Sequence, residues 1–417
     1  MKAIVISVGD ELLSGRTLNT NLKTISEFLQ SFGIEVYRDY TVKDDVEEIK
    51  NAIKNAVKDA DIVIVTGGLG ITPDDVTRDA VAQAFDRRLI FKEDLYSEIE
   101  QKMQQCGVTI TDHHKKYGFV PEGFGIIKND KGLAPGYYLK QNGKLFIVLP
   151  GPPHELQNVL SNAAKLFESH GRVTTKTVKT FGLKESDIVE RLKNVMDQLS
   201  PIGFYPIVPG MVDLKLTIRG DDEHKLTREL NKKLKILKSR IGEAIYGYDD
   251  DTLESVLGKV LRESHMTIST AESCTGGLVA NLITDVPGSS DYFKGGVVSY
   301  WNEAKMCLLG VSDEILNYFG AVSEPTAVMM AEGVRKLLQT DVGIATTGIA
   351  GPTGGTLEKP VGLVYMAVSV RGKITVINKI FQGNRTFIKK QAAYTVLDLA
   401  RRKIREYLDE TDRCRIG

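Results

Sequence analysis

A strand-to-helix turn is predicted at Thr270-Ala-Glu-Ser-Cys-Thr-Gly-Gly-Leu278, the stretch that decides the fold of the last third of the chain. Residues 265–270 alternate and are rich in β-branched side chains, which favours a strand, and residues 278–283 continue at helical spacing. Ser273 is therefore expected on a glycine-rich turn. Free backbone N–H groups and the positive end of the helix dipole at such a turn suit an oxyanion or a phosphate group.

A base is needed before Ser273 can act as a nucleophile, and Lys305 in Tyr300-Trp-Asn-Glu-Ala-Lys305 is a candidate. A lysine accepts a proton only when it is neutral, so burial or a cationic neighbour would have to lower its pKa. The turn alone favours a simpler interpretation, in which Ser273 caps the helix and Lys305 is an ordinary surface lysine.

A second glycine-rich loop favours the interpretation of Ser273 as a nucleophile over that of a helix cap. Residues 342–347 form a short apolar strand that runs into Gly348-Ile-Ala-Gly-Pro-Thr-Gly-Gly355. Two such loops at strand ends in one domain indicate a ligand crevice at the carboxyl ends of parallel strands.

Further motifs follow in order along this region. The set is Ala271-Glu-Ser-Cys-Thr-Gly-Gly277, Gly288-Ser-Ser290, Tyr300-Trp-Asn-Glu-Ala-Lys305, Gly320-Ala-Val-Ser-Glu-Pro325, Thr347-Gly-Ile-Ala-Gly-Pro352, Lys359-Pro-Val-Gly362 and Gly383-Asn-Arg385. Together these motifs resemble the carboxyl-terminal domain of the CinA (competence/damage-inducible protein A) family. The resemblance implies an α/β domain that hydrolyses the carboxamide of nicotinamide mononucleotide to nicotinate mononucleotide and ammonia, without a cofactor.

The resemblance also implies roles for single residues. Ser273 matches the nucleophile and Lys305 its base, and Tyr300 is expected near the substrate as a rival acid for the leaving ammonia. Arg385 would offer its fork of donors to the phosphate of the mononucleotide, although the family often has Asp where Asn384 stands. The other expected substrate-binding residues are Thr275, Gly276, Gly277, Thr347, Gly348 and Gly351.

Composition narrows the class of protein. The chain has 417 residues, enough for two or three domains, and Lys plus Arg equal Asp plus Glu at 54 each, so that no net charge favours nucleic acid or a membrane. The four cysteines (Cys106, Cys274, Cys307 and Cys414) have no zinc-site spacing, and we expect a reducing, cytoplasmic compartment. No apolar run approaches the length of a membrane span. Cys274 is expected to be a buried, inert thiol, because no His follows it in the chain.

Residues 1–168 alternate strand and helix signals, which predicts βαβ units and a mainly parallel wound sheet. Polar, glycine-rich clusters follow its strands: Gly9-Asp-Glu-Leu-Leu-Ser-Gly15, Thr66-Gly-Gly-Leu-Gly-Ile-Thr-Pro-Asp-Asp-Val-Thr-Arg-Asp79 and Leu149-Pro-Gly-Pro-Pro-His-Glu155. Because glycine lets the backbone approach a phosphate closely, a nucleotide-binding set is expected at Gly9, Gly67, Gly68, Gly70 and Gly151. Candidate ligands for a hard cation are Glu11, Asp74 and Asp75, although an Asp near a helix start is also a favoured cap.

These clusters resemble the molybdopterin-binding-like domain that forms the amino-terminal part of CinA proteins. The resemblance implies either binding of a molybdopterin-type ligand or an ADP-ribose pyrophosphatase activity that uses a divalent metal, Mg²⁺ or Co²⁺. Lys115 matches the family lysine and would pair with phosphate, whereas Lys116 and Leu133 stand where the family has Gln and Thr. His113 and His114 are adjacent and point apart, so we expect them on the surface and not at a metal.

Residues 169–249 signal strand, helix, strand, helix, and predict a small α+β module that ends in a linker at Tyr246-Gly-Tyr-Asp-Asp-Asp251. The CinA resemblance implies a KH-like fold here. However, no Gly-x-x-Gly loop lies between its helices, and the basic run at residues 232–240 is typical of a solvated helix face. We therefore expect a spacer or a dimerisation element of a homodimer, and no RNA site.

The predicted organisation is a molybdopterin-binding-like domain at 1–168, a KH-like module at 169–249 and a deamidase domain at 250–417. The alternative function is that of a binding protein, which holds a molybdopterin-like ligand or a partner in DNA uptake. Neutral charge and the absence of a basic stripe argue against direct binding of DNA.

Overall fold

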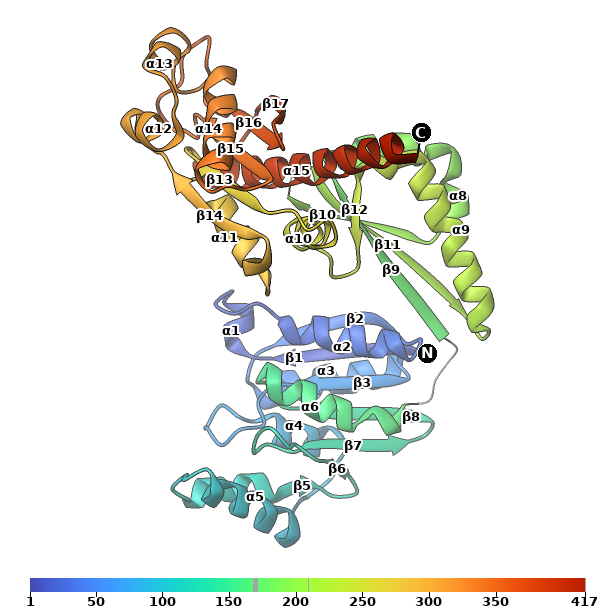
Figure 1. Cartoon of the computed structure of the whole chain (residues 1–417). Coiled ribbons are helices and arrows are strands. Elements are labelled where there is room, and N and C mark those ends of the chain that lie inside the picture. Colours follow the sequence, from blue (N-terminus) through green and yellow to red (C-terminus); the bar gives the residue numbers. More distant parts are fainter. Residues whose placement is uncertain (168–171, 209, 417) are drawn as a thin grey trace. The chain divides into compact units, whose positions relative to one another are not determined.

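The computed structural model describes residues 1–167, 172–208 and 210–416 (Figure 1). By contacts the chain divides into two compact units: Met1–Thr174 with Ile218–Arg228, and Thr175–Thr217 with the residues from Glu229 onward. The predicted boundary between residues 168 and 169 lies outside the described residues. Among the described helices, none combines the length and the apolar character that crossing a membrane requires.

The amino-terminal domain is a six-stranded sheet in the order β2-β1-β3-β8-β7-β6. Its strands are β1 (Lys2–Val8), β2 (Glu35–Val42), β3 (Ile62–Thr66), β6 (Gly125–Ile127), β7 (Gly136–Gln141) and β8 (Lys144–Leu149). The strands β2, β1, β3 and β8 pair in parallel. The last two pairings, of β8 with β7 and of β7 with β6, are antiparallel. This confirms the predicted wound α/β class.

Helices cover both faces of this sheet, which explains why β1 and β3 are almost wholly apolar and buried. The helices are α1 (Asp10–Leu13), α2 (Thr20–Ser31), α3 (Val46–Asp59), α4 (Thr77–Ala84), α5 (Glu93–Gln105) and α6 (Pro153–Asn162). One core packs under α3, α4 and α5, and the other under α2 and α6. The strands β4 (Leu89–Phe91) and β5 (Phe119–Pro121) form a small antiparallel sheet, and a 3₁₀ turn at Asp112–Gly118 directly precedes β5.

The middle module is a four-stranded sheet in the order β10-β11-β9-β12, with helices α7 (Glu185–Leu192), α8 (Met196–Leu199) and α9 (Glu223–Ile241). Its strands are β9 (Arg172–Phe181), β10 (Ile202–Val208), β11 (Met211–Gly220) and β12 (Ile245–Tyr248). The sequence prediction missed β10 and β12. The predicted linker was wrong at its start, because Tyr248 pairs with Val178 of β9 inside the sheet.

The carboxyl-terminal domain is a five-stranded sheet in the order β14-β13-β15-β16-β17. Its strands are β13 (Ile268–Glu272), β14 (Phe293–Val298), β15 (Val342–Gly348), β16 (Leu363–Val370) and β17 (Lys373–Ile380). Because β14, β13 and β15 are parallel, the loops that follow β13 and β15 meet at one edge, as predicted.

Two cores hold this sheet between its helices. One lies under α10 (Leu253–Glu263), α11 (Leu278–Thr284) and the long α15 (Arg385–Ile416), and the other under α12 (Asn302–Leu309), α13 (Asp313–Phe319) and α14 (Glu324–Leu337). Helix α15, drawn in red in Figure 1, packs against α10, α11 and the sheet. Its first turns thereby come close to the serine turn between β13 and α11.

Candidate functional site

The serine turn has the predicted form. Gly276 and Gly277 take the left-handed backbone conformation, with φ of +62° and +93°, so that the chain can reverse between β13 and α11. The N–H of Ser273 donates to the carbonyl of Thr346 at 2.9 Å, which ties the turn to the end of β15. The serine is 9% exposed, so the surrounding residues cover most of its surface.

The start of helix α11 differs from expectation, because a carboxylate already occupies it. Glu272 is 1% exposed, and its carboxylate accepts the N–H groups of Gly277, Val279 and Ala280 at 2.8–3.0 Å. The expectation that these groups are free for an anion was wrong. The same contacts exclude Ser273 as the cap of α11, since Glu272 performs that function.

Two N–H groups of the turn remain available for an oxyanion. Those of Cys274 and Thr275 donate to no other residue that the structure describes, although the N–H of Cys274 lies near its own thiol. Both follow Ser273 directly in the chain, where donors to a developing oxyanion are needed. The site therefore offers two backbone donors beside its serine.

Lys305 is buried, with 1% of its surface exposed, on helix α12. Its Nζ donates to the carbonyl of Ser299 at 2.8 Å, and it forms no ion pair with a described residue. Burial lowers the pKa of its ammonium below the ordinary lysine value. The interpretation of Lys305 as a surface lysine is thereby excluded.

Lys305 and the serine turn lie close together. Ser299, whose carbonyl holds Lys305, donates its N–H to the carbonyl of Glu272 at 2.8 Å, immediately before Ser273. The charge of Lys305 also acts on the thiol of Cys274, the residue after Ser273. The structure therefore brings the candidate base to the segment beside the serine turn, and no hydrogen bond joins Lys305 to Ser273 within the described residues.

Tyr300, Arg385 and Gly351 form a second group. Nη1 of Arg385 donates to the carbonyl of Gly351 at 2.7 Å, and Nη2 donates to the hydroxyl of Tyr300 at 2.8 Å. Tyr300 is 57% exposed, so this group lies at the mouth of the site. The guanidinium has five N–H donors, and these two contacts leave others for a ligand.

Three of the predicted substrate-binding residues have structural contacts. The hydroxyl of Thr275 bonds that of Thr346 at 2.6 Å, and the hydroxyl of Thr347 donates to the carbonyl of Ala321 at 2.6 Å. Both threonines are fully buried. A Cβ on Gly348 would lie 2.6 Å from the carbonyl oxygen of Leu363, so this glycine permits strand pairing. The side chains of Thr275 and Thr347 thus hold the turn and the loop in place.

Sequence reasoning missed two polar residues beside the turn. Ser299 is fully buried, and its hydroxyl has no partner among the described residues. Lys389 on α15 places its Nζ 3.4 Å from the point that a Cβ on Gly276 would occupy. Neither residue belongs to a glycine-rich loop, so only the packing of β14 and α15 brings them here.

Cys274 is buried, as predicted, and burial raises the pKa of its thiol to about 12. Because the thiolate is the reactive form, we expect Cys274 to resist iodoacetamide at pH 8 in the folded protein, while the exposed Cys106 and Cys307 are alkylated. Peptide mass spectrometry after brief labelling checks this. Fast labelling of Cys274 would show that the turn is open and would restore the thiol as a candidate nucleophile. The side chain of Cys414 lies outside the described residues.

A cavity of about 220 Å³ in the amino-terminal domain brings together residues from all three predicted clusters. It is lined by the predicted Gly9, Glu11, Gly67, Gly68, Asp75 and Gly151. It is also lined by Asn21 and Asp44, which the sequence analysis did not single out. Gly67 has a φ of +105°, and a Cβ there would lie 2.3 Å from the carbonyl oxygen of Val8. This glycine is required by the close approach of the loop to β1.

Other predicted residues of this domain lie outside that cavity. Lys115 is exposed and pairs with Asp112 at 2.9 Å, whereas Nζ of Lys116 reaches the carbonyl of Thr72 at 3.1 Å, in the loop that carries Asp75. The lysine beside the loop is thus Lys116 and not the predicted Lys115. Gly70 leaves space for Asp75, since a Cβ on Gly70 would lie 2.4 Å from the aspartate Oδ2.

The three predicted metal ligands do not converge. Glu11 and Asp75 line the cavity, but Asp74 does not. Burial raises the pKa of Asp44, and the nearby carboxylates of Glu11, Asp10 and Asp74 raise it further. In the described part of the chain, no three His, Cys, Asp or Glu side chains form a cluster that could hold a metal ion.

The glycine-rich cluster at residues 66–79 follows β3 and runs into helix α4, which begins at Thr77. One prediction about this domain was wrong. His114 is not on the surface: it is 9% exposed, and its Nδ1 accepts the N–H of Thr111 at 3.0 Å. This contact is local and explains the burial without a metal.

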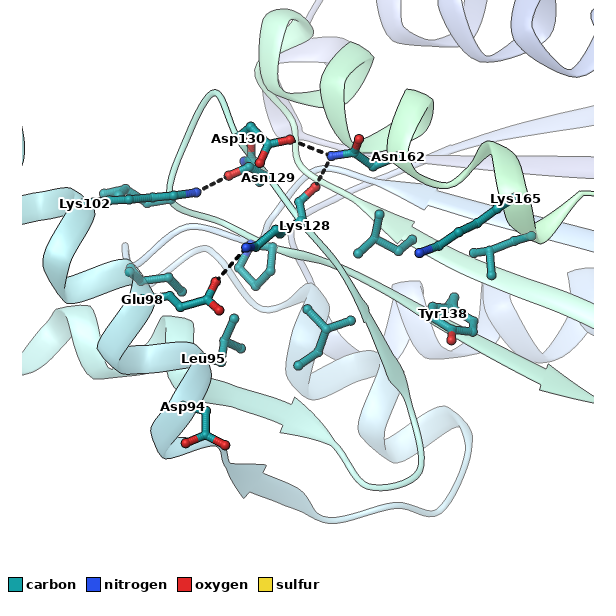
Figure 2. Close-up of a pocket in the computed structure, with 16 residues that line it drawn as sticks. Asp94, Leu95, Glu98, Lys102, Lys128, Asn129, Asp130, Tyr138, Asn162 and Lys165 are labelled. Carbon is teal, nitrogen blue, oxygen red and sulfur yellow. Dashed lines mark hydrogen bonds and ion pairs between the residues drawn. The ribbon is translucent and has the colours of Figure 1, made fainter.

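A larger cavity of the same domain, of about 570 Å³, lies between α5 and the strand β6 (Figure 2). Several of its charged side chains are engaged with one another or with the backbone. Lys128 pairs with Glu98 at 3.3 Å, and Lys102 donates to the backbone carbonyl of Asn129. None of the residues predicted to bind a nucleotide lines it. The 220 Å³ cavity is therefore the better candidate despite its smaller volume.

The folds and the sites define a multidomain α/β protein in which a wound, molybdopterin-binding-like domain precedes a separate domain with a serine turn. Comparison with known families agrees. Residues 4–168 match the probable molybdopterin binding domain, residues 175–247 the damage-inducible protein CinA KH domain, and residues 250–404 the CinA C-terminal domain.

Relatives resemble the chain over nearly its whole length. A protein of Caldicellulosiruptor saccharolyticus that carries a competence-damage inducible name is 41% identical over 411 residues, which cover 98% of this chain and 100% of the relative. A CinA-like protein of Kosmotoga olearia is 40% identical, over 97% of this chain and 99% of its own. The solved structure of a CinA protein with unknown function from Thermoplasma acidophilum is 36% identical and covers 40% of this chain and 99% of its own, with a TM-score of 0.38. The chain belongs to the CinA family.

Proposed function

We propose that the carboxyl-terminal domain hydrolyses the carboxamide of nicotinamide mononucleotide, with Ser273 as nucleophile and Lys305 as base. The observation that carries the proposal is the burial of Lys305 beside the serine turn without a carboxylate partner. Burial lowers the pKa of this lysine, which favours the neutral amine that a base must be. Family membership supports the proposal through the CinA domain, and the substrate comes from the resemblance of the motifs.

The proposed chemistry proceeds through an ester. Lys305 Nζ takes the proton of the Ser273 hydroxyl as the serine oxygen bonds to the carboxamide carbon, and the negative charge moves to the carbonyl oxygen. In this proposal the N–H groups of Cys274 and Thr275, which donate to no other described residue, stabilise that oxygen. Lys305 then returns its proton to the departing nitrogen, which leaves as ammonia. Water hydrolyses the remaining ester, releasing nicotinate mononucleotide and restoring Ser273.

In this proposal Tyr300 contributes to substrate binding and Lys305 to proton transfer. Its hydroxyl accepts from Arg385 at the mouth of the site, whereas Lys305 lies buried beside the turn. The assay for the proposal is ammonia release from nicotinamide mononucleotide, with nicotinate mononucleotide identified as the second product. A wild-type protein that releases no ammonia would support the alternative, a ligand-binding or partner-binding protein of this family.

We propose ADP-ribose pyrophosphatase activity as a second function, at the 220 Å³ cavity of the amino-terminal domain. The observation that favours it is that Glu11, Asp44 and Asp75 line the same cavity as the glycine-rich turns, although they do not form a three-carboxylate cluster in the described chain. Mg²⁺ usually binds through one or two carboxylates plus substrate phosphates, so it does not need a complete protein cluster, and Glu11, Asp44 and Asp75 are the side chains that would hold it. A bound divalent ion would supply charge to polarise a phosphoryl oxygen.

Asp75 and Asp74 provide a matched pair of substitutions for this second function, because only Asp75 lines the cavity. We expect Asp75→Asn to reduce AMP formation from ADP-ribose and to raise the Mg²⁺ concentration needed for half-maximal rate, by about tenfold or more. Asp74→Asn should change either quantity much less. Titration of the AMP-forming rate with Mg²⁺ measures both. Equal effects of the two substitutions, or turnover without a divalent ion, would contradict the assignment.

A further inference from the structure

The 570 Å³ cavity between α5 and β6 takes part in neither of the two proposed activities (Figure 2). No residue lines both this cavity and the 220 Å³ cavity, which holds the predicted nucleotide-binding residues. Its volume lies within the range of roughly 300–1,000 Å³ that is usual for sites of small molecules. The amino-terminal domain thus has a second cavity of a size that suits a ligand.

The floor of this cavity is apolar. Ile99 of α5, Ile127 of β6 and Leu166 line it and are buried. Leu95 and Leu133 also line it, and their side chains are half-buried. A ligand that covers apolar surface removes it from water, which is favourable by about 25 cal/mol per Å². The floor therefore favours a ligand with an apolar or aromatic body.

Most of the charged side chains around this floor are compensated by their neighbours. Lys128 pairs with Glu98 at 3.3 Å. The carboxylate of Asp130 accepts from Nδ2 of Asn162 at 2.8 Å, and this bond and the nearby charge of Lys102 lower the pKa of the carboxyl group. These groups therefore leave little net charge for a ligand to neutralise.

Lys165, which follows α6, differs from the other two lysines of the cavity. Within the described part of the chain, no hydrogen bond or ion pair engages its ammonium. Figure 2 shows its side chain at the end of the cavity that also holds Tyr138, whose hydroxyl can donate a hydrogen bond. The exposed Asp94, on the first turn of α5, lies at the opposite end in the same view. One end of the cavity therefore offers an uncompensated positive charge beside the apolar floor.

We propose that this cavity is a binding site for a small amphipathic anion, which has an apolar or aromatic body and a single carboxylate or sulfonate group, with Lys165 as its charge partner. The body would cover the apolar floor, and the anionic group would accept from Nζ of Lys165. A ligand with several phosphate groups fits less well, because Lys102 and Lys128 have carboxylates beside them. The inference is independent of the deamidase and of the pyrophosphatase.

Calorimetric titration of the full chain with decanoate tests the proposal, and decylamine is the matched cation of equal chain length. The wild type should bind decanoate more tightly than decylamine. Lys165→Ala should raise the Kd for decanoate about three- to tenfold, the effect of losing one exposed charge-assisted contact, and should not weaken decylamine. Lys131→Ala is the control, because Lys131 is an exposed lysine of the same domain that does not line the cavity. It should change the Kd for decanoate by less than about twofold.

A second variant tests the apolar part of the site. Ile126 lines the cavity and is 39% exposed on the edge strand β6, so its replacement is expected to leave the fold intact. Ile126→Asp removes apolar contact and adds a negative charge, and it should raise the Kd for decanoate by about tenfold or more.

Three results would overturn the proposal. The first is equal affinity of the wild type for decanoate and decylamine, and the second is an equal effect of Lys165→Ala and Lys131→Ala. The third is a dimer in sedimentation velocity that Ile126→Asp converts to a monomer, when the wild type binds no decanoate. That result would show that a second copy of the chain, and not a small anion, covers the cavity.

Discussion

Replacing Ser273 by alanine is expected to reduce ammonia release from nicotinamide mononucleotide by at least about a thousandfold in kcat, because loss of a nucleophile leaves only the oxyanion donors and binding to act. The oxyanion donors and the cations at the mouth of the site stay in place in this variant. KM should therefore change little, and the loss should appear in kcat. Steady-state measurement of ammonia release at saturating substrate gives the reduction in kcat.

The stability of the same variant provides its control. No described residue accepts or donates a hydrogen bond to the Ser273 hydroxyl, and Glu272 rather than Ser273 caps α11. We therefore expect the melting temperature of Ser273→Ala to remain within about 2 °C of the wild type, as is usual when no named structural interaction is lost. A large fall in melting temperature together with lost activity would point to a structural role for the serine. Retained activity would exclude Ser273 as the nucleophile.

Lys305→Met is expected to lower kcat by about a hundred- to ten-thousandfold, the usual contribution of a positioned general base. Methionine fills a similar volume without a proton acceptor. Lys305→Arg should be equally impaired, because a guanidinium stays protonated at every accessible pH. Substantial activity in Lys305→Arg would show that the residue contributes charge and not basicity.

The pH dependence follows from the lowered pKa of Lys305. The base is active when neutral, so kcat/KM of the wild type should rise with pH and level off above the lowered pKa, below the ordinary lysine value of about 10.4. The free energy of unfolding should also depend on the protonation of Lys305. Between the lowered folded pKa and about 10.4 the unfolded chain binds more protons than the folded one, so the free energy of unfolding of the wild type should rise with pH relative to Lys305→Met. If the free energies of unfolding of the wild type and of Lys305→Met change with pH in parallel, the pKa of Lys305 is not lowered in the folded protein.

Periodicity in the sequence was sufficient for most of the fold, because long amphipathic helices and apolar strands dominate it. The basic run at residues 232–240, for example, lies on a helix as predicted, within α9 (Glu223–Ile241). The strand β10 was not predicted because Gly203 and Pro206 interrupt its pattern. It lies at the edge of its sheet, where proline is tolerated. The strand β12 was not predicted because its short sequence resembles a linker.

The site was predictable where it depends on turns and not where it depends on packing across elements. The turn at Ser273 and the neighbouring loop after β15 follow from local sequence. Glu272 occupies the start of α11. The only signal for this in the sequence is an acidic residue at the end of an apolar strand, directly before the turn. Lys389 belongs to an ordinary helical pattern, and its direction depends on how α15 packs against α11.

The most direct test of the covalent mechanism is the trapping of its ester by hydroxylamine during turnover of nicotinamide mononucleotide. If Ser273 forms an acyl intermediate, product analysis by mass spectrometry will show the hydroxamate of nicotinate mononucleotide. Its ratio to nicotinate mononucleotide will grow in proportion to hydroxylamine concentration, and Ser273→Ala will form neither product. Nicotinate mononucleotide as the sole product at every hydroxylamine concentration would contradict the account, since water would then attack the carboxamide directly.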